Sequence, residues 1–320
     1  MESIKTVAVI GAGALGLLFM DSITKISDIN SFFLADEERF FKLNNKVFNI
    51  NGDMVQFPVK CMTEISDSVD LVLICVKNYH LDGIQPLLTK ICGKNTIIIS
   101  VLNGITSELF LEEHLPESHI IYSAVLGMDA VTLGNSLQFT KKGKFLIGSK
   151  NNEITEAVTM VKEFFEIIHY DYIISNDIHK EIWYKWMINI GVNQLSAITG
   201  ATYGSFQKNR DLQILMEDTM KETIKVAALE NVLLTSNDIS SWYKVLNTLG
   251  PNGKTSMLQD IEAKRKTEVE SFSGDLIKYA QKHGVDVPIN KMLYQLIKIK
   301  ESLFMYDSTK GDISLNSDNL

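Results

Sequence analysis

Residues 5–20 read KTVAVIGAGALGLLFM, and this stretch decides the fold. Thr6–Ile10 is a run of β-branched and apolar residues, apart from Ala8, as expected of a strand buried on both faces. The next six residues, 11–16, form a G-x-G-x-x-G motif, and apolar residues then recur at helical spacing. Strand, glycine turn and helix is the context in which this motif binds a dinucleotide.

Each glycine of the motif has a predicted role. Gly11 allows the tight turn, Gly13 lets the backbone approach a pyrophosphate, and Gly16 lets the helix lie close on the strand. The helix then directs its unpaired N–H groups and positive dipole end at the phosphates. The alternatives are a turn that binds no ligand and a secretory signal, against which the short, glycine-broken run argues. The predicted cofactor-binding residues here are Gly11, Ala12, Gly13, Ala14, Leu15 and Gly16.

The composition excludes several classes of function. A chain of 320 residues is comfortable for two domains, and its net charge of -8 argues against nucleic-acid binding. No apolar stretch approaches the roughly 20 residues of a membrane helix. The six histidines show no metal-ligand spacing, so no metal is expected. The three cysteines form no C-x-x-C pair and indicate reduced thiols in a cytoplasmic protein, with Cys75 in the core or, alternatively, a catalytic thiol.

The secondary-structure pattern changes once along the chain. Strands and helices alternate to about residue 175, which predicts an α/β domain over 1–175 with a Rossmann-type, doubly wound, mainly parallel sheet. Only helical patterns follow, which predicts an all-α substrate and catalytic domain over 176–320 with a polar tail frayed from about Asp307. No flexible linker separates the two, so we expect the site in the cleft between them.

Individual elements can also be predicted. Lys46–Val59 indicates a hairpin with a type I′ turn at Asn51-Gly52. Ser136–Thr140 and Lys144–Ile147 are predicted to pair as a second hairpin. The expected helices of the second half are Ile182–Ala197, Asp211–Glu230, Ser256–His283 and a last one from Pro288 to about Phe304.

The end of the second predicted strand bears on cofactor choice. Asp36 follows Ser31–Ala35, where an acidic residue normally binds the adenosine ribose, and Arg39 lies three residues further on, where an arginine could accommodate a 2′-phosphate. The motif rule alone therefore favours NADH. In the alternative interpretation Asp36 caps a helix whose first turn carries Glu37 and Glu38.

Lys77 and Asn103 each follow directly after a predicted buried strand. In doubly wound sheets ligands bind at the carboxyl ends of the strands, so both are candidate site residues. Alternatively, Lys77 is a solvated lysine at a helix entry and Asn103 a turn residue before Gly104.

A polar stripe runs along the apolar helix predicted at Ile182–Ala197. Lys185, Asn189 and Asn193 recur at i, i+4 and i+8 and are predicted to share a face. Such groups on a buried helix need partners, so they form either an ordered core network or a binding site. A lysine in a partly dry cleft can have its pKa lowered towards neutrality, which suits a proton donor.

Five stretches of the chain together point to one family: GAGALG at 11–16, VK at 76–77, LNG at 102–104, WYKWMINIGVN at 183–193 and SMLQDIEAKRKTEVE at 256–270. With these motifs the chain resembles the ketopantoate reductase (2-dehydropantoate 2-reductase) family over nearly its whole length. The resemblance implies an oxidoreductase that uses NADPH to reduce 2-dehydropantoate to (R)-pantoate, a step towards pantothenate and coenzyme A.

The resemblance also implies roles for single residues. Lys185 matches the catalytic lysine that protonates the carbonyl oxygen, and Glu268 matches a glutamate that contacts a substrate hydroxyl and helps to position the lysine. Lys77 matches a cofactor-binding lysine near the nicotinamide and the substrate carboxylate, and Asn103 is also expected at the cofactor. The implied substrate contacts are Asn103, Asn189, Asn193 and Ser256.

Two points do not fit this pattern simply. On one straight helix Ser256 and Glu268 would lie about 120° apart, so both could face a site only if Ser256 lay in the first turn or the loop before it. Alternatively, Ser256 is an N-cap and Glu268 a surface partner of Lys264. The family usually has an arginine at the end of strand two, where this chain has Ala35-Asp36, so NADP is the family default and NAD stays an alternative.

Other functions remain open at this stage. A related 2-oxo acid or 3-hydroxy acid dehydrogenase would have the same two-domain build with a different substrate. A non-enzymatic dinucleotide-binding sensor would bind the cofactor without turnover. The expected partner is a small 2-oxo acid, and the amphipathic C-terminal helices could either form a homodimer interface or pack on each other.

Overall fold

The computed structural model describes residues 3–313, with side chains to Phe304. The chain divides into two compact units, the first ending at Ile182 and the second beginning at Trp183.

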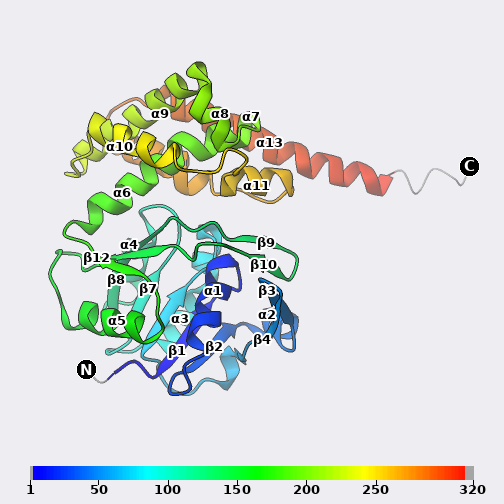
Figure 1. The fold of residues 1–320 in the computed structure, drawn as a ribbon, viewed down its shortest axis with the longest axis vertical. Helices are drawn as coiled ribbons and strands as arrows, with labels where there is room; N and C mark the ends of the chain where they lie inside the picture. The colour runs from blue at the N-terminus through cyan, green and yellow to red at the C-terminus, as the bar shows by residue number, and fades with distance from the viewer. Residues whose placement is uncertain (1–2, 314–320) are drawn as a thin grey trace, which may run out of the picture. The chain divides into compact units, whose positions relative to one another are not determined.

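The first unit is built on an eight-stranded sheet with the order β12-β11-β8-β7-β6-β1-β2-β5 (Figure 1). Every neighbouring pair is parallel except β8 and β11, which confirms the predicted mainly parallel sheet. The strands are β1 (Thr6–Ile10), β2 (Asn30–Ala35), β5 (Val59–Cys61), β6 (Leu71–Ile74), β7 (Ile97–Ser100), β8 (His119–Leu126), β11 (Lys144–Gly148) and β12 (Tyr172–Ile174).

Helices cover both faces of this sheet. Because side chains alternate along a strand, Val7 and Val9 of β1 pack in one apolar cluster, and Ala8 and Ile10 pack in another. The first cluster includes residues of α1 and α5, and the second includes residues of α3 and α4, so the sheet is doubly wound. The helices are α1 (Ala14–Ile23), α2 (Glu37–Leu43), α3 (Leu81–Ile91), α4 (Ser107–His114) and α5 (Glu156–Ile167), with short turns η1 (Met62–Glu64) and η2 (Asn78–His80).

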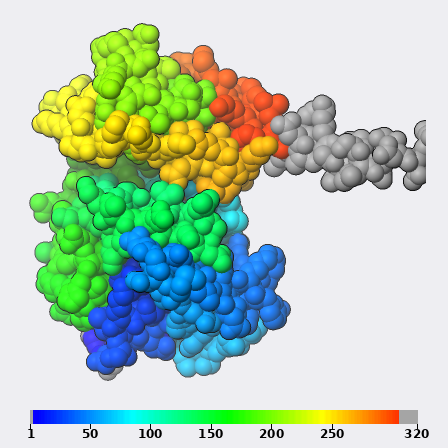
Figure 2. All heavy atoms as spheres, turned by 45° about the vertical axis from the view of Figure 1, so that its right-hand side comes forward, coloured from blue at the N-terminus to red at the C-terminus, as the bar shows by residue number. Residues whose placement is uncertain are grey.

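A second, four-stranded sheet in this unit has the order β4-β3-β10-β9. The predicted turn at Asn51-Gly52 is confirmed, with φ of 51° and 105°, both positive as a type I′ turn requires. Figure 2 shows this sheet at the surface, where blue residues of β3 and β4 adjoin green residues of β9 and β10. The strands are β3 (Val47–Ile50), β4 (Asp53–Gln56), β9 (Val131–Leu133) and β10 (Ser136–Gln138).

The second predicted hairpin is wrong. Ser136–Gln138 pairs with β9 and β3, whereas Lys144–Gly148 joins the main sheet antiparallel to β8. Apolar content explains the difference, because Phe145 and Ile147 are fully buried in the large apolar cluster on one face of the main sheet. The true β9–β10 turn contains Gly134, whose φ is 60°.

Residues 183–313 contain helices and turns without a strand, as the sequence predicts for this half (Figure 1). The chain enters this unit through α6, which begins at Ile178. The elements are α6 (Ile178–Ile188), η3 (Asn189–Asn193), α7 (Gln194–Thr199), α8 (Tyr203–Lys208), α9 (Arg210–Leu229), α10 (Ser236–Leu246), α11 (Ser256–Glu262), η4 (Glu270–Gly274), α12 (Asp275–Lys282) and α13 (Pro288–Ile313).

Three helix predictions need correction. The helix expected at 182–197 starts earlier and is interrupted by η3, a π-helical turn. The helix expected at 256–283 is three separate elements, because Lys264 adopts a left-handed conformation (φ 52°) and ends α11. The last helix extends past Phe304 into the predicted frayed tail, since polar composition alone does not end a helix and no proline follows Pro288. Residues 314–320 of that tail lie outside the described residues.

The glycine motif yields a stability test. Gly16→Ala would place a methyl group 1.9 Å from the Gly11 carbonyl oxygen, whereas Gly83→Ala, also in a helix, would meet no atom within 4 Å. We expect Gly16→Ala to lower the free energy of unfolding by about 1–3 kcal/mol or more through overpacking. Gly83→Ala should raise it by up to about 1 kcal/mol through helix propensity. Denaturant unfolding measures both, and equal effects would contradict the packing argument.

Candidate functional site

The glycine loop lies at the point where the strand order reverses. The chain leaves β1 for β2 on one side, and later places β6 on the other side of β1. Such a switch point opens a ligand-binding crevice at the carboxyl ends of the strands. Gly11 follows β1 with a φ of 108°, and a methyl group on it would lie 2.7 Å from the carbonyl carbon of Cys75, just after β6.

Packing inside the protein explains two of the three glycines. Position 11 favours glycine because its backbone is left-handed, and position 16 requires glycine because a side chain there would collide with the Gly11 carbonyl. Gly13 is different, because a methyl group there would come no closer than 3.9 Å to the surrounding atoms and its φ is an ordinary -82°. The protein alone gives no reason for glycine at this exposed position, and close approach of a ligand does.

The start of α1 provides donors at the same place. Gly13 is its N-cap, no side chain caps it, and its first turn contains no acidic residue. The first N–H groups of an α-helix have no partner within the helix, and the dipole is positive at this end. The start of α1 is therefore able to bind a phosphate group.

The structure places Lys77 and Asn103 at the same edge of the sheet. Lys77 follows β6 and Asn103 follows β7, as predicted. The side-chain amide of Asn78 donates a hydrogen bond to the Asn103 carbonyl, which joins the two loops. Both Lys77 and Asn103 are partly buried.

Cys75 lies between β6 and Lys77. Burial raises the pKa of its thiol, so the protonated form is stabilised. A nucleophilic cysteine needs the opposite shift. Cys75 therefore fits the predicted packing role rather than the alternative of a catalytic thiol.

Asp36 caps α2, as the alternative interpretation proposed. Its Oδ1 accepts a hydrogen bond from the Arg39 N–H at 2.7 Å, and its Oδ2 lies 3.7 Å from Nη1 of the Arg39 guanidinium. Glu37 and Glu38 occupy the first turn of the helix. The Arg39 side chain thus faces the carboxylate that the motif rule assigns to the ribose, and a ribose contact of Asp36 stays a prediction.

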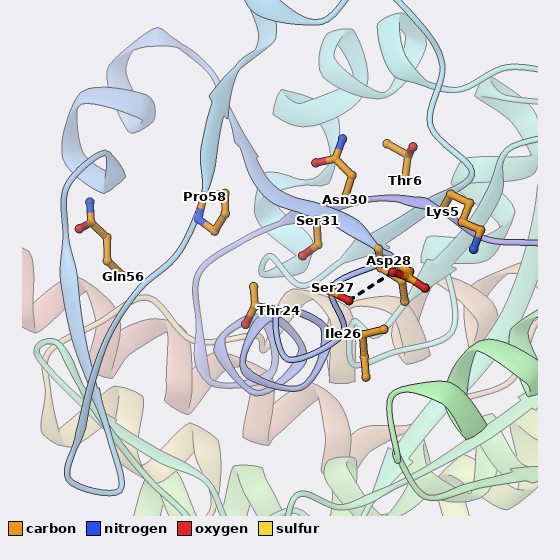
Figure 3. A pocket seen from close by; sticks show the side chains of 11 residues that line it. Lys5, Thr6, Thr24, Ile26, Ser27, Asp28, Asn30, Ser31, Gln56 and Pro58 are labelled. Atoms are coloured by element: carbon orange, nitrogen blue, oxygen red, sulfur yellow. Dashed lines mark hydrogen bonds between the residues drawn. The ribbon is translucent and has the colours of Figure 1, made fainter.

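A surface hollow of about 590 Å³ lies elsewhere in this unit (Figure 3). Its walls include Lys5 and Thr6 at the start of β1, and Asn30 and Ser31 at the start of β2. These are the amino ends of parallel strands, opposite to the edge where doubly wound sheets bind ligands. The hollow is therefore not part of the candidate site.

In the second unit, three predicted residues lie on one continuous segment. Lys185 is in α6, and Asn189 and Asn193 are the first and last residues of η3. The Asn193 amide donates to Oδ1 of Asn189 at 3.4 Å, which confirms that the two asparagines share a face.

The π-turn also bears on the position of Lys185. In a regular α-helix eight residues advance by about 800°, which would leave Lys185 and Asn193 about 80° apart. A π-turn holds roughly one extra residue, so the effective advance is that of seven residues and the separation falls to about 20°. The wider turn therefore brings Lys185 and Asn193 closer together around the helix axis than a regular helix would.

The segment that carries Glu268 packs against the same helical segment. Trp186 Nε1 donates to the Ser271 carbonyl at 2.7 Å, and η3 contacts both η4 and α11. Glu268 lies in the turn before η4, and only 4% of its surface is exposed. The fold of the second unit thus gathers Lys185, Asn189, Asn193 and Glu268 on adjoining segments.

Two alternatives for this region are wrong. Thr255, not Ser256, caps α11, with its hydroxyl accepting from the Leu258 N–H at 3.2 Å. Glu268 is buried and outside any α-helix, so it is not a surface partner of Lys264 at i−4. Because Ser256 and Glu268 are on different elements, the angular conflict of a single helix does not arise, and Ser256 is the exposed first residue of α11.

Sequence reasoning missed both π-turns. Each contains a glycine inside an apparently helical pattern, which is the one signal that could have indicated an irregularity. A methyl group on Gly191 would lie 2.6 Å from Cγ of Met220 in α9, and one on Gly274 would lie 3.0 Å from Oε2 of Glu270. Close packing therefore accounts for glycine at position 191, whereas the atom nearest to a methyl group at position 274 is the end of a flexible side chain.

Within residues 3–313 no group of three or more His, Cys, Asp or Glu side chains is arranged to hold a metal ion. Among the helices of that same range, none has the length and apolar character needed to cross a membrane.

The chain matches known proteins over both units. Residues 7–152 match the family described as ketopantoate reductase PanE/ApbA, and residues 177–301 match its C-terminal family. A 2-dehydropantoate 2-reductase of Aquifex aeolicus is 25% identical over 312 residues, 94% of this chain and 98% of the relative.

Two solved structures share the fold. A D-mandelate dehydrogenase, in a ternary structure with NADH and anilino(oxo)acetate, has a TM-score of 0.84 at 22% identity and covers 93% of this chain and 99% of that one. A dimeric ketopantoate reductase of Staphylococcus aureus has a TM-score of 0.76 at 21% identity over the same shares. The glycine loop, the two-unit fold and the matches to both family models together show that this chain belongs to the ketopantoate reductase family of oxidoreductases.

Proposed function

We propose that the protein reduces 2-dehydropantoate to (R)-pantoate with NADPH, in the cytoplasm, as a step of pantothenate and coenzyme A biosynthesis. The family membership supports this, and the observation that carries it is the set of polar residues around η3. A lysine, two asparagines and a buried glutamate lie there on adjoining segments. These are the groups that binding and protonating a 2-oxo acid requires.

Lys185 is assigned as the proton donor. Reduction of a ketone at C2 develops negative charge on the oxygen, and a positioned ammonium both stabilises that charge and supplies the proton. Asn189 and Asn193 fit substrate orientation, because amides hydrogen-bond without competing for the proton. Glu268 fits a contact to a substrate hydroxyl, and Asn103 and Ser256 complete the proposed substrate contacts.

The first unit fits a nicotinamide dinucleotide, which supplies the hydride when bound. The residues that would hold it are those of the glycine loop, with the start of α1 directed at the pyrophosphate. Lys77 and Asn103 would lie at its nicotinamide end. Asp36 would accept from the adenosine ribose.

Two features of the sequence bear on the choice between NADPH and NADH. NADPH is the default that the family resemblance implies. An acidic residue directly after β2 favours NADH, and Nη1 of the Arg39 guanidinium lies 3.7 Å from Oδ2 of Asp36. The D-mandelate dehydrogenase was solved with NADH. We propose further that two chains form a homodimer, as described for the Staphylococcus aureus reductase.

Lys185→Ala tests the mechanism. We expect kcat with 2-dehydropantoate to fall at least about a hundredfold, since general acid groups contribute factors of this size. Lys221→Ala, which removes an exposed lysine of α9, is the matched control and should leave kcat unchanged. Steady-state assays of cofactor absorbance measure both, and a Lys185→Ala enzyme of normal activity would refute the assignment.

Asp36→Asn tests the cofactor assignment while preserving the helix cap, because asparagine caps as well as aspartate. Removing the charge beside a 2′-phosphate should shift the ratio of kcat/KM for NADPH over NADH upwards. Glu38→Gln removes a neighbouring exposed charge of the same helix and should leave the ratio unchanged. An unaltered ratio in Asp36→Asn would exclude the proposed ribose role.

A second candidate function is reduction of another 2-oxo acid or oxidation of a 3-hydroxy acid. The observation that favours it is that a D-mandelate dehydrogenase shares the fold of this chain at a TM-score of 0.84. A panel of 2-oxo acids, each assayed with NADPH and NADH, separates the two candidates. Cofactor binding without turnover of any member would instead indicate a dinucleotide-binding sensor.

A further inference from the structure

Thr267, the residue before Glu268, is held by two strong hydrogen bonds. Its backbone N–H and its hydroxyl both donate to Oε1 of Glu301 in α13, each at 2.7 Å. Only 1% of the Thr267 surface is exposed, and the Glu301 side chain is 11% exposed. Hydrogen bonds to a carboxylate this poorly solvated are charge-assisted and stronger than those between neutral groups.

The same hydroxyl also fixes the other side of Glu268. Thr267 Oγ1 accepts from the Val269 N–H at 3.3 Å, so the backbone on both flanks of Glu268 is tied to one side chain. Rotation of the Thr267 or Glu268 backbone would break at least one of these bonds. The orientation of Glu268 therefore depends on Thr267, and the position of Thr267 depends on Glu301.

Glu301 is itself held in place by its own helix. Lys298 Nζ lies 3.6 Å from Oε2 of Glu301 and 2.9 Å from Oε1 of Glu270 in η4. Tyr294 donates to the same Glu270 carboxylate at 2.9 Å. Tyr294, Lys298 and Glu301 recur at i, i+4 and i+7 and so share one face of α13. This face thus binds both the turn before Glu268 and the turn after it.

We propose that Thr267 and Glu301 are positioning residues for Glu268. The inference rests on the proposed function, in which Glu268 contacts the substrate. Neither residue is assigned a contact with substrate. Removing a carboxylate from water costs free energy unless the carboxylate is fully hydrogen-bonded. If the contact between Thr267 and Glu301 served only packing, apolar side chains would fill the same space at a lower cost. What the carboxylate adds is a defined direction for the backbone that carries Glu268.

The test is a double-mutant cycle on steady-state kinetics. Thr267→Val keeps the shape and removes the hydroxyl, whereas Thr267→Ser keeps it. In the wild-type background Thr267→Val should lower kcat/KM by about ten- to a hundredfold, because small misplacements of a site group have effects of this size. Thr267→Val should change kcat and KM in the same proportions as Glu268→Gln does. Thr267→Ser should restore most of the activity.

In the Glu268→Gln background, Thr267→Val should have no further effect on kcat/KM beyond about twofold. Glu301→Gln should behave as Thr267→Val does. Glu222→Gln is the matched control, because Glu222 in α9 likewise accepts hydrogen bonds from two N–H groups of the backbone, those of Ile289 and Asn290 in α13, and no hydrogen bond joins it to Thr267. Its effect should persist unchanged in the Glu268→Gln background.

The other possible results separate the positioning role from the reductase assignment. Equal losses from Thr267→Val in both backgrounds, or no loss in either, would refute the positioning role while leaving the reductase assignment intact. A wild-type protein that reduces no 2-oxo acid would refute the proposed function and this role together. Faster amide hydrogen exchange of residues 267–269 in Thr267→Val than in Thr267→Ser would show that the hydroxyl holds this turn, and equal exchange would show that it does not.

Discussion

The fold of the first unit depends on one steric constraint, the contact between the start of α1 and the end of β1. Gly16 lies so near the Gly11 carbonyl that any side chain would push the helix off the strand. Because this contact holds α1 against β1, the helix begins at the carboxyl edge of the sheet, where β1 adjoins β6. The loops after β6 and β7 meet at the same edge through Asn78 and Asn103. One close backbone contact thus determines where a ligand can bind.

Much of the architecture could be predicted, because the main strands are apolar runs and the glycine motif has a specific local context. The helical second half was equally clear from its periodicity. The pairing of β10 was not, since three residues with one buried side chain, Leu137, fit several partners equally well. What decided it was the apolar strand β11, which the main sheet requires and which is therefore not available to β10.

The candidate site was predicted in composition more successfully than in conformation. Asn189 and Asn193 share a face as expected, and Asp36 caps its helix as one of two interpretations held. The conformation around Glu268 could not be foreseen, because the backbone N–H of Thr267 bonds to Glu301, 34 residues further along the chain than Thr267. Periodicity reports only local preference, and here a buried tertiary hydrogen bond outweighs it. The roles of Lys185 and Glu268 come from the family resemblance, and periodicity alone suggests only that Lys185 shares a face with the two asparagines.

The widened turn at η3 has a consequence for comparing this chain with others. Since the bulge holds one extra residue, a homologue with a regular helix could present the same lysine and second asparagine on one side at an offset of seven positions, instead of the eight from Lys185 to Asn193. A gap of one at this place in an alignment would then mark a change of helix type and not a loss of the pair. The number of positions from the lysine to the second asparagine, more than the identity of either residue, therefore indicates whether the bulge is present.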